Sequence, residues 1–432
     1  EIRFLRRAIL PGQRVIDIGA NYGTYALSLA RTVGPRGRIW AFEPASSTAA
    51  LLAESIAIND FEHVVLEQSA LSAQSGTAKL ALHGNAELNA LTRSESPAGR
   101  TESVQVITLD KYIAARDVAA VDFIKIDAEG QELNILHGGH HFFGTQSPLV
   151  QFEIKTDSGP SLELARALTE LDYGIYRLAP GPGILIPFEL TETIDNYLLN
   201  LFACKPERAN ALAEQGLLVE NIPVAGGWDE SADWENVLAG LPYGRILADQ
   251  WRKVPEDDAE REEVEQALAL YAVSRNTSLP PAERIAALET GYQELHELTR
   301  TAPARLRLAS LARMASDYGA RKTAVDALRQ LCASIAGNRN TDLSEPFLIP
   351  EPRYEGLEPG PDLDHWVFIA ILEALERLHA FSSYYTGQDA RARLELICAS
   401  GFASAEMHRR LDLVNRRFQP GQNSSKSING PR

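Results

Sequence analysis

The chain has 432 residues, and a length of this order predicts two or three domains of about 150 residues each. Asp and Glu number 58 against 42 Lys and Arg, which gives a net charge of −16 and argues against a protein that binds nucleic-acid phosphates or anionic lipid headgroups. A hydrophobic content of 45% and a charged content of 23% are ordinary for a globular protein, so they exclude a disordered chain and a coiled-coil rod.

Three cysteines, Cys204, Cys332 and Cys398, lie far apart in the sequence and offer no close pair for metal binding or redox chemistry, which favours a reducing compartment. No apolar run approaches the roughly 20 residues that cross a bilayer, and the amphipathic opening segment, residues 1–10, is unlike a signal peptide. We expect a cytoplasmic protein without a transmembrane segment. Only eight of the 42 basic residues are Lys, which suggests a GC-rich bacterial genome.

Between about residues 13 and 206, short apolar runs alternate with helical patterns, as in the βαβ units of a parallel sheet. Residues 76–107 alternate polar and apolar side chains instead, and predict an antiparallel excursion from that sheet. We expect residues 1–206 to form an α/β domain. The strands are expected at 14–18, 38–42, 64–67, 123–127, 149–154, 174–178 and 197–204, and helices at 24–33, 47–58, 132–136 and 161–171.

Beyond residue 206, long stretches rich in Ala, Leu, Arg and Glu predict an all-α accessory region, with residues 207–340 as a helical domain. The apolar spacing between Leu308 and Leu331 fits one tetratricopeptide helix pair. No second copy lies at the repeat period, so a generic helical hairpin describes it better.

The remaining part, residues 341–418, is expected to combine an extended connector with C-terminal helices. Five prolines between residues 341 and 361 forbid a regular helix there. Residues 419–432 are polar and rich in Gly, Ser and Asn, and predict a flexible tail.

The first expected strand ends in the turn D-I-G-A-N-Y-G at 17–23 and leads directly into an apolar helix. Gly19 and Gly23 let the backbone turn tightly and approach a ligand, and the helix N-terminus offers unpaired N–H groups. Such a turn is typical of nucleotide-type sites, although some bind nothing. The pyrophosphate fingerprint G-x-G-x-x-G is incomplete, so S-adenosylmethionine, which has no phosphate, is favoured over NAD.

Glu43 lies at the end of the second expected strand, about 20 residues beyond the glycine turn. A carboxylate at this place can accept both ribose hydroxyls of an adenosine. The alternative is an ordinary exposed carboxylate at a strand end. Together with the glycine turn, Glu43 favours adenosine.

These motifs resemble the FkbM-type methyltransferases within the class I S-adenosylmethionine-dependent fold. The resemblance covers about residues 13–155, and the fold that it implies extends to Pro206. It implies a Rossmann-like sheet of seven strands whose last strand is antiparallel, with S-adenosylmethionine over the carboxyl ends of the first two. The other motifs that carry it are Phe42-Glu43-Pro44, Asn59, Ala70-Leu71-Ser72, Thr108-Leu109-Asp110 and I-K-I-D-A-E-G-Q-E at 124–132.

The resemblance also implies the cofactor-binding residues. Asp17, Gly19 and Asn21 would hold the methionine end of the donor, and Glu43 would hold the ribose. Adenine would lie between two residues after the third strand, at a point where many class I enzymes place an acid and this chain has Ser69. The full expected set is Asp17, Gly19, Ala20, Asn21, Gly23, Glu43, Ser69 and Ala70.

Alternation along the fourth strand places Phe123, Lys125 and Asp127 on one face of the sheet. A buried ammonium group needs a partner, and we expect Lys125 to pair with Glu153 on the fifth strand. The alternative is that Lys125 lies near the strand end and extends to water.

Transfer of a methyl group to a hydroxyl requires removal of the hydroxyl proton. Asp127, Glu129 and Glu153, in that order, are the candidates for the base, with Lys125 as their neighbour. They could instead hold a divalent cation, which the sequence permits but does not support. Glu129 has the alternative role of capping its loop. The His-rich segment 137–141 matches no common ligand set, so no metal site is predicted there, although His140 is an alternative base.

The expected function is transfer of a methyl group from S-adenosylmethionine to a hydroxyl of a sugar, glycan or polyketide-type natural product, because the family that it resembles acts on such acceptors. An uncharged acceptor is compatible with the charge of −16, and no nucleic-acid substrate is expected. One alternative is N-methylation of a small amine. Another is a vestigial methyltransferase fold that binds a protein partner through its helical half.

Overall fold

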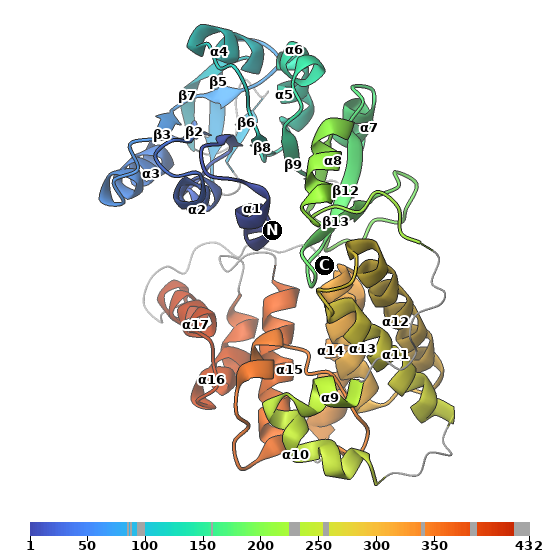
Figure 1. Ribbon diagram of the computed structural model, residues 1–432. Coiled ribbons are helices and arrows are strands. Elements are labelled where there is room, and N and C mark those ends of the chain that lie inside the picture. Colours follow the sequence, from blue (N-terminus) through green and yellow to red (C-terminus); the bar gives the residue numbers. More distant parts are fainter. Residues whose placement is uncertain are drawn as a thin grey trace. The chain divides into compact units, whose positions relative to one another are not determined.

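The chain divides into two compact units in the computed structural model (Figure 1). The first comprises Glu1–Pro223 with Pro280–Glu283, and the second comprises Val224–Leu279 with Arg284–Arg432. The expected tail at 419–432 lies outside the described residues. The structure describes residues 1–83, 86, 89–92, 100–156, 159–223, 234–253, 259–337, 342–380 and 387–418.

An eight-stranded sheet forms the centre of the first unit, with the strand order β13-β12-β14-β9-β8-β1-β2-β3. The five strands from β3 to β9 in this order are parallel, and β14 is antiparallel to β9. The order reverses beside β1, as it does at the switch point of a doubly wound α/β sheet. The strands are β1 (Arg14–Ile18), β2 (Arg38–Phe42), β3 (Val64–Glu67), β8 (Phe123–Ile126), β9 (Leu149–Glu153), β12 (Gly174–Ala179), β13 (Ile184–Pro187) and β14 (Asn200–Cys204).

The sheet has one strand more than the seven that were expected. The additional strand, β13, follows a turn at Gly183 with a φ of +66° and pairs antiparallel with β12. Its four residues end at Pro187 and follow closely after Pro180 and Pro182. Prolines are typical of loops, and this explains why the apolar run did not predict a strand.

Helices cover both faces of the sheet. Val15 and Phe123 face one helical layer, whereas their strand neighbours Ile16 and Ile124 face the other. A sheet that is buried on both faces accounts for the nearly continuous apolar runs of its strands. One layer contains α1 (Ile2–Ala8), α2 (Thr24–Val33), α3 (Ser46–Ile58) and α8 (Pro206–Glu214), and the other α4 (Leu109–Arg116), α5 (Glu132–Gly138), α6 (His140–Thr145) and α7 (Glu163–Thr169).

A second, four-stranded sheet in the first unit has the order β4-β7-β5-β6. β5 is antiparallel to both neighbours, which confirms the predicted antiparallel excursion. Leu80 and Val104 of this sheet pack against Ala45 and Ala70, so the sheet covers the segments that follow β2 and β3. Its strands are β4 (Ala70–Leu71), β5 (Gly76–Leu82), β6 (Ala90–Thr92) and β7 (Arg100–Ile107), and a separate pair is formed by β10 (Lys155–Thr156) and β11 (Gly159–Pro160).

Helices are the regular elements of the second unit over the residues that the structure describes. The expected hairpin is formed by α13 and α14, joined at Gly319 with a φ of +99°. The described part of the proline-rich connector contains a 3₁₀ turn, η2 (Pro352–Gly356), as does the approach to α16 at η4 (Gln388–Ala390). The helices are α9 (Trp234–Ala239), α10 (Pro242–Trp251), α11 (Ala259–Arg275), α12 (Pro281–Thr301), α13 (Arg305–Tyr318), α14 (Arg321–Gly337), α15 (Leu363–His379), α16 (Arg391–Ala399) and α17 (Ala405–Arg417).

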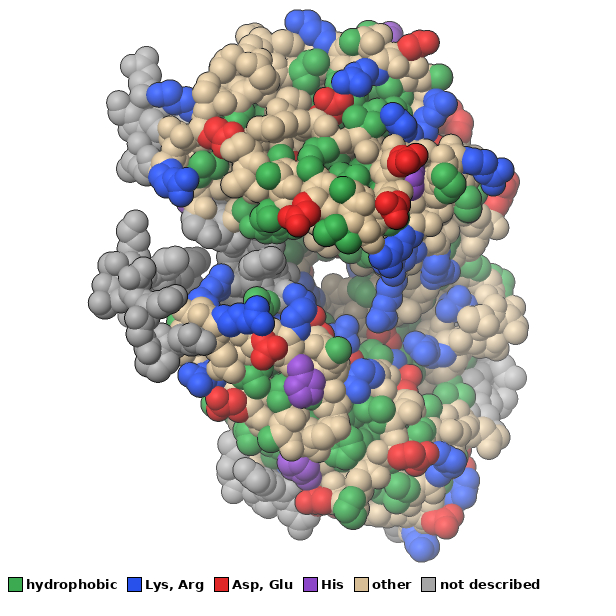
Figure 2. Space-filling view, turned by 90° about the vertical axis from the view of Figure 1, so that its left-hand side faces the viewer, with side chains coloured by type: hydrophobic (Ala, Val, Ile, Leu, Met, Phe, Trp, Pro, Cys, Tyr) green, Lys and Arg blue, Asp and Glu red, His purple; other side chains and the backbone are tan. Residues whose placement is uncertain are grey.

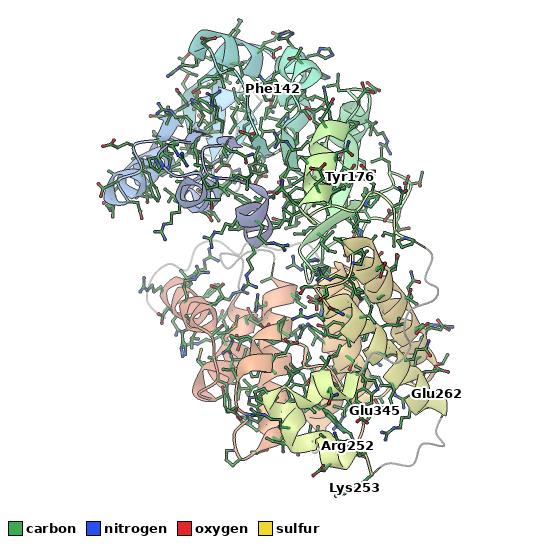
Figure 3. All side chains as sticks on the ribbon, in the orientation of Figure 1. Phe142, Tyr176, Arg252, Lys253, Glu262 and Glu345 are labelled. Carbon is green, nitrogen blue, oxygen red and sulfur yellow. The ribbon has the colours of Figure 1, made fainter. Side chains whose placement is uncertain are left out.

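Burial separates core from surface within each unit. Phe142 points into the core of the first unit, whereas Arg252, Lys253 and Glu262 lie on the outside of the second (Figure 3). On the face shown in Figure 2, acidic and basic side chains are interspersed, with hydrophobic side chains in small groups between them. Among the described residues, no helix combines the length and the hydropathy needed to span a membrane.

Candidate functional site

Apart from Ser69 and Ala70, which follow β3, the predicted site residues lie in or directly after four neighbouring parallel strands, β1, β2, β8 and β9, whose carboxyl ends lie at one edge of the sheet. The register aligns Asp17 with Lys125, and Lys125 with Gln151. Glu43 and Asp127 each follow the last residue of their strand. The topology therefore brings the expected donor-binding and catalytic residues together.

The turn after β1 lies directly against the end of β8. Gly19 has a φ of +74°, and a Cβ atom there would lie 1.8 Å from the backbone oxygen of Asp127. Gly23, with a φ of +89°, immediately precedes α2, and a Cβ on it would lie 2.5 Å from the side chain of Leu52. Only glycine fits either position. Asn21 between them has a φ of +48°, a conformation that concentrates at functional sites.

Two buried oxygens in this turn accept no hydrogen bond from the described residues, Asp17 Oδ1 and Asn21 Oδ1. The other oxygen of Asp17 accepts a 2.9 Å hydrogen bond from the backbone N–H of Ala26. Burial raises the pKa of Asp17, and Lys125 opposes the rise. Because buried polar atoms are normally satisfied, the two oxygens fit a ligand that donates hydrogen bonds.

Ala20 contributes to the turn itself. Its N–H group donates to the carbonyl of Phe42 at 2.9 Å, and its carbonyl accepts from Gly23 at 2.8 Å. Its methyl group belongs to the core that lies against α1 and α2. Ala20 therefore shapes the turn with backbone groups that are already paired.

Glu43 is buried and fixed by two backbone donors. One carboxylate oxygen accepts from the N–H of Asn21, and the other from the N–H of Ala45, both at 2.9 Å. Burial raises its pKa. The alternative of an exposed strand-end carboxylate is wrong, because only 6% of Glu43 is exposed. Each oxygen keeps a second lone pair that could accept from a hydroxyl.

Ser69 and Ala70 lie where the large sheet meets the small one. The N–H of Ser69 donates to the carbonyl of Glu67 at 2.8 Å, and Ala70 begins β4. Ala70 is buried with Ala45 in the core of the small sheet. These two residues are therefore close to the segment after Glu43.

Lys125 is buried, with only 4% of its surface exposed. Its ammonium nitrogen is 2.9 Å from Asp127 Oδ2 and 3.9 Å from Asp17 Oδ1. The predicted ion pair with Glu153 is therefore wrong, and so is the alternative that Lys125 extends to water. The register explains the first error, because Gln151 lies opposite Lys125 and Glu153 lies two residues further along. Burial would lower the pKa of Lys125, but Asp127 and Asp17 outweigh it and raise that pKa.

The three candidate bases form one cluster. Asp127, Glu129 and Glu153 each offer a carboxylate oxygen, and these oxygens lie within 4.8 Å of one another. Burial would raise the pKa of Asp127, but Lys125 outweighs it and holds this pKa below its usual range. Burial, followed by the charges of Asp127 and Glu129, raises the pKa of Glu153 to about 9. The group could share a proton or hold a divalent cation.

The loop between β8 and α5 is capped by Glu132. One of its carboxylate oxygens accepts from the N–H groups of Ala128 at 3.0 Å and Gly130 at 3.1 Å. Glu132 thus has the capping role that was the alternative for Glu129. Glu129 itself is exposed and has a φ of +48°, followed by Gly130 at +88°.

Two residues that the sequence did not single out also belong to the site, Tyr25 and Gln151. The hydroxyl of Tyr25 donates to Glu1 at 2.8 Å and accepts from Gln151 Nε2 at 3.0 Å. Burial and Glu1 raise the pKa of Tyr25 well above its ordinary value. Gln151 was detectable as a polar residue in a buried strand, whereas no sequence signal marked Tyr25.

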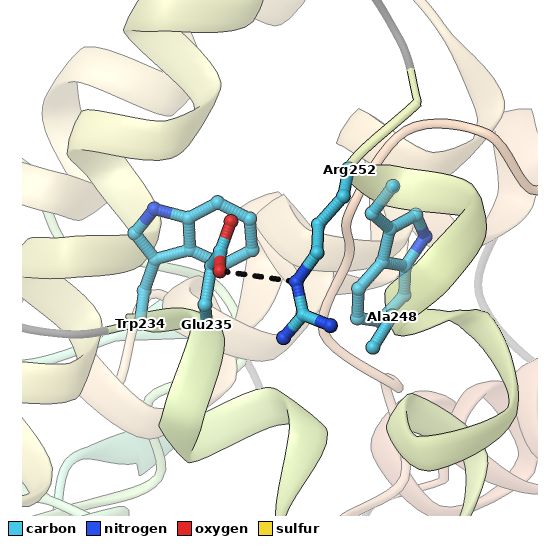
Figure 4. A pocket seen from close by; sticks show the side chains of 5 residues that line it. Trp234, Glu235, Ala248 and Arg252 are labelled. Atoms are coloured by element: carbon cyan, nitrogen blue, oxygen red, sulfur yellow. Dashed lines mark ion pairs between the residues drawn. The ribbon is translucent and has the colours of Figure 1, made fainter.

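Other candidate features lie away from this cluster. His140 and His141 are exposed, and within the described ranges no His joins the group of metal-ligand type. A pocket of about 180 Å³ in the second unit is lined by Trp234, Glu235, Ala248, Trp251 and Arg252. There Arg252 pairs with Glu235 at 3.5 Å (Figure 4). The pocket is smaller than usual ligand sites.

A comparison with protein families finds a similarity within the first unit. Residues 17–175 match the family model of the methyltransferase FkbM domain. No curated protein sequence matches the chain. Residues 17–175 are thus similar to the methyltransferase FkbM domain, which confirms the predicted resemblance over this region.

Several solved structures are similar over a little less than half of the chain. The methyltransferase FkbM from Methylobacillus flagellatus is 18% identical with a TM-score of 0.33, and the match covers 45% of this chain and 44% of that one. A putative rRNA-methylase from Clostridium thermocellum is 12% identical with a TM-score of 0.29, over 47% and 92% of the two chains. An S-adenosylmethionine-dependent O-methyltransferase from Thermotoga maritima is 15% identical with a TM-score of 0.25, over 47% and 63%.

Proposed function

We propose that this protein transfers a methyl group from S-adenosylmethionine to a hydroxyl oxygen of a sugar, glycan or polyketide-type acceptor. The observation that carries the proposal is the meeting of the glycine turn, Glu43 and the carboxylate cluster at one edge of the sheet of an FkbM-type domain. The donor supplies a methyl group activated by a positively charged sulfur. The residues of the first unit bind the donor, orient the acceptor and remove the proton of its hydroxyl.

The donor-binding assignment is supported by unsatisfied and fixed polar groups in the candidate site. Asp17 and Asn21 each keep an oxygen that accepts no hydrogen bond from a described residue, which suits the ammonium group of a methionine end. Glu43 is held by two N–H groups with lone pairs available for ribose hydroxyls. Gly19 leaves room for the backbone to approach. Of the remaining expected residues, Ala20 and Gly23 shape the turn, and Ser69 and Ala70 would flank the adenine.

Proton removal is assigned to the carboxylate cluster. Asp127 is kept charged by Lys125, so it can accept a proton near pH 7. Glu153, with a pKa of about 9, is protonated at that pH and donates a hydrogen bond to Asp127. Asp127 is therefore proposed as the base and Glu153 as the group that orients it. Glu129 borders the acceptor from its exposed position.

Binding of S-adenosylhomocysteine, measured by calorimetric titration, tests the proposal first. We expect saturable heat with a micromolar dissociation constant and weaker binding for Glu43→Ala. No heat at high micromolar ligand would favour the alternative of a vestigial fold that acts as an interaction scaffold. Glu54→Ala, an exposed substitution on α3, is the control.

Release of S-adenosylhomocysteine from S-adenosylmethionine, in a panel of neutral sugars, lactones and small amines, tests the acceptor class. N-methylation is the second candidate, because the carboxyl cluster, in which Asp127 stays charged, can attract a cationic amine. Turnover with amines alone would favour it. Loss of turnover on chelation, restored by Mg²⁺, would assign the cluster to a metal-assisted mechanism.

A further inference from the structure

The ammonium group of Lys125 is enclosed by three neighbours. Asp127 and Asp17 supply opposite charge at 2.9 and 3.9 Å. On a further side, the nitrogen lies 4.9 Å from the centroid of the Tyr25 ring, over its face. A cation at this distance from an aromatic face is attracted to it, and the ring also excludes water from that side.

The Tyr25 ring is fixed by its hydroxyl. Gln151 donates a hydrogen bond to it at 3.0 Å, and Glu1 accepts one from it at 2.8 Å. Gln151 is fully buried and is the register partner of Lys125 on the adjacent strand. The contacts therefore close a ring from Lys125 through Tyr25 to Gln151 and back across the sheet.

Tyr25 also connects this ring to the donor turn. It lies in the first turn of α2, immediately before Ala26, whose N–H binds Asp17 at 2.9 Å. We propose that Tyr25 is a positioning residue for the Lys125–Asp127 pair, with its ring face covering the buried ammonium and its hydroxyl held by Gln151. The inference rests on the proposed function, since Asp127 is the base assigned there.

Without the ring, water can reach the ammonium, and the flexible Lys side chain gains conformations. The position of the Asp127 carboxylate depends on an ordered Lys125, because 35% of the Asp127 side chain is exposed and Lys125 is its ion-pair partner. We therefore expect the Asp127 carboxylate to be less ordered where it would face the acceptor.

Lysine NMR tests the placement directly. The chain has eight lysines, so ¹³Cε-lysine labelling gives few signals, and Lys125→Arg assigns the one of interest. Protons over an aromatic face shift upfield. We expect Tyr25→Leu to abolish the upfield shift of Lys125 and Tyr25→Phe to retain it. Lys205, 5.2 Å from the centroid of Tyr173, is the internal control, and its signal should not move in either variant.

Two donor analogues test whether the Asp127 carboxylate becomes less ordered. Sinefungin carries a protonated amine where S-adenosylmethionine carries its transferable methyl group, so its affinity relative to S-adenosylhomocysteine reports on the negative charge facing that position. We expect this ratio to fall at least about threefold in Tyr25→Leu, equivalent to about 0.65 kcal/mol, and to stay within about twofold in Tyr25→Phe.

An unchanged Lys125 signal or an unchanged affinity ratio in Tyr25→Leu would overturn the inference. Should that variant not fold, Gln151→Leu decides in its place, because it removes the donor that fixes the hydroxyl. It is expected to reduce the upfield shift of Lys125 by at least about half, and no reduction would contradict the proposal. If neither analogue binds the wild-type protein, the proposed function fails, while the NMR result still decides the placement of Tyr25.

Discussion

Single residues of the candidate site hold backbone conformations that few side chains tolerate. Gly19 and Gly23 have positive φ values, and so do Asn21, Glu129 and Gly130. These residues belong to the two loops that follow β1 and β8, both at the edge where the candidate site lies. Strained conformations of this kind persist only where the surrounding structure enforces them, and they concentrate around ligands.

Gly19→Ala should disrupt donor binding, because its Cβ would lie 1.8 Å from the backbone oxygen of Asp127. We expect affinity for S-adenosylhomocysteine to fall at least about tenfold, or about 1.4 kcal/mol, in calorimetric titration. Gly12→Ala is a matched control, since Gly12 has a φ of +89° but no atom within 4 Å of the added Cβ. Equal donor affinity in the two variants would contradict the assignment of the turn.

Asp127→Asn and Glu153→Gln should separate the base from the group that orients it. We expect the first to lower kcat at least about 100-fold, because an amide cannot accept the proton. For Glu153→Gln we expect kcat to stay within about tenfold of the wild-type value, because Gln can still donate the hydrogen bond that protonated Glu153 donates. The measurement is the initial rate of S-adenosylhomocysteine release with the acceptor found in the panel. The reverse order of effects would make Glu153 the base.

The pH dependence of stability should also report on Glu153. Its pKa rises to about 9 in the folded protein, so between its unfolded pKa and pH 9 the folded state binds more protons than the unfolded state. Stability therefore falls as pH rises through this range. Glu153→Gln should remove that fall and raise stability at pH 9 relative to pH 5 by at least about 1.4 kcal/mol, one pKa unit. Parallel curves of Tm against pH for the two proteins would refute it.

The residue types of the site could be predicted from the sequence, but their contacts could not. The D-I-G-A-N-Y-G turn, Glu43 and Asp127 stand in motifs whose order along the chain is informative. The partner of Lys125 depends on the register between β8 and β9, and this register cannot be read from the sequence. Tyr25 was missed because an aromatic residue in an apolar helix looks like ordinary core.

At the scale of elements, apolar runs located the central strands because a sheet covered on both faces needs them. β13 escaped because it is short and lies among prolines. The α13–α14 hairpin was visible in its apolar periodicity and in Gly319, whose positive φ ends α13. What the periodicity could not supply is the set of buried ion pairs that hold the helices of the second unit.

Arg313 is the most deeply buried of the described arginines in the second unit and should be important for its stability. Its guanidinium pairs with Asp317 at 2.9 Å and with Glu355 at 2.6 Å, and only 1% of its side chain is exposed. Arg313→Leu would leave a buried carboxylate without compensation, so we expect a loss of about 3 to 5 kcal/mol in the free energy of unfolding. Denaturant unfolding followed by circular dichroism measures it.

An exposed pair on the same hairpin provides the control. Lys322 pairs with Asp326 at 2.6 Å one turn away on α14, with both side chains about half exposed. Lys322→Ala should change the free energy of unfolding by less than about 1 kcal/mol. A similar loss in both variants would show that burial does not determine the contribution of these pairs.

At the scale of the whole molecule, every residue assigned to the proposed reaction comes from the first unit. We therefore expect residues 1–223, expressed alone, to bind S-adenosylhomocysteine within about threefold of the full chain, or about 0.65 kcal/mol. Calorimetric titration checks this, with circular dichroism to establish folding. A folded fragment without affinity would show that the second unit contributes to donor binding.

The close approach between Gly19 and the backbone of Asp127 limits how the candidate site can be redesigned. The loop that is proposed to bind the donor and the strand end that carries the proposed base touch without an intervening side chain. Neither can be replaced by a loop of another length or shape while the other stays unchanged. The two segments would therefore have to be exchanged together. Substitutions meant to change acceptor specificity alone would have to begin after Asp127, at Glu129.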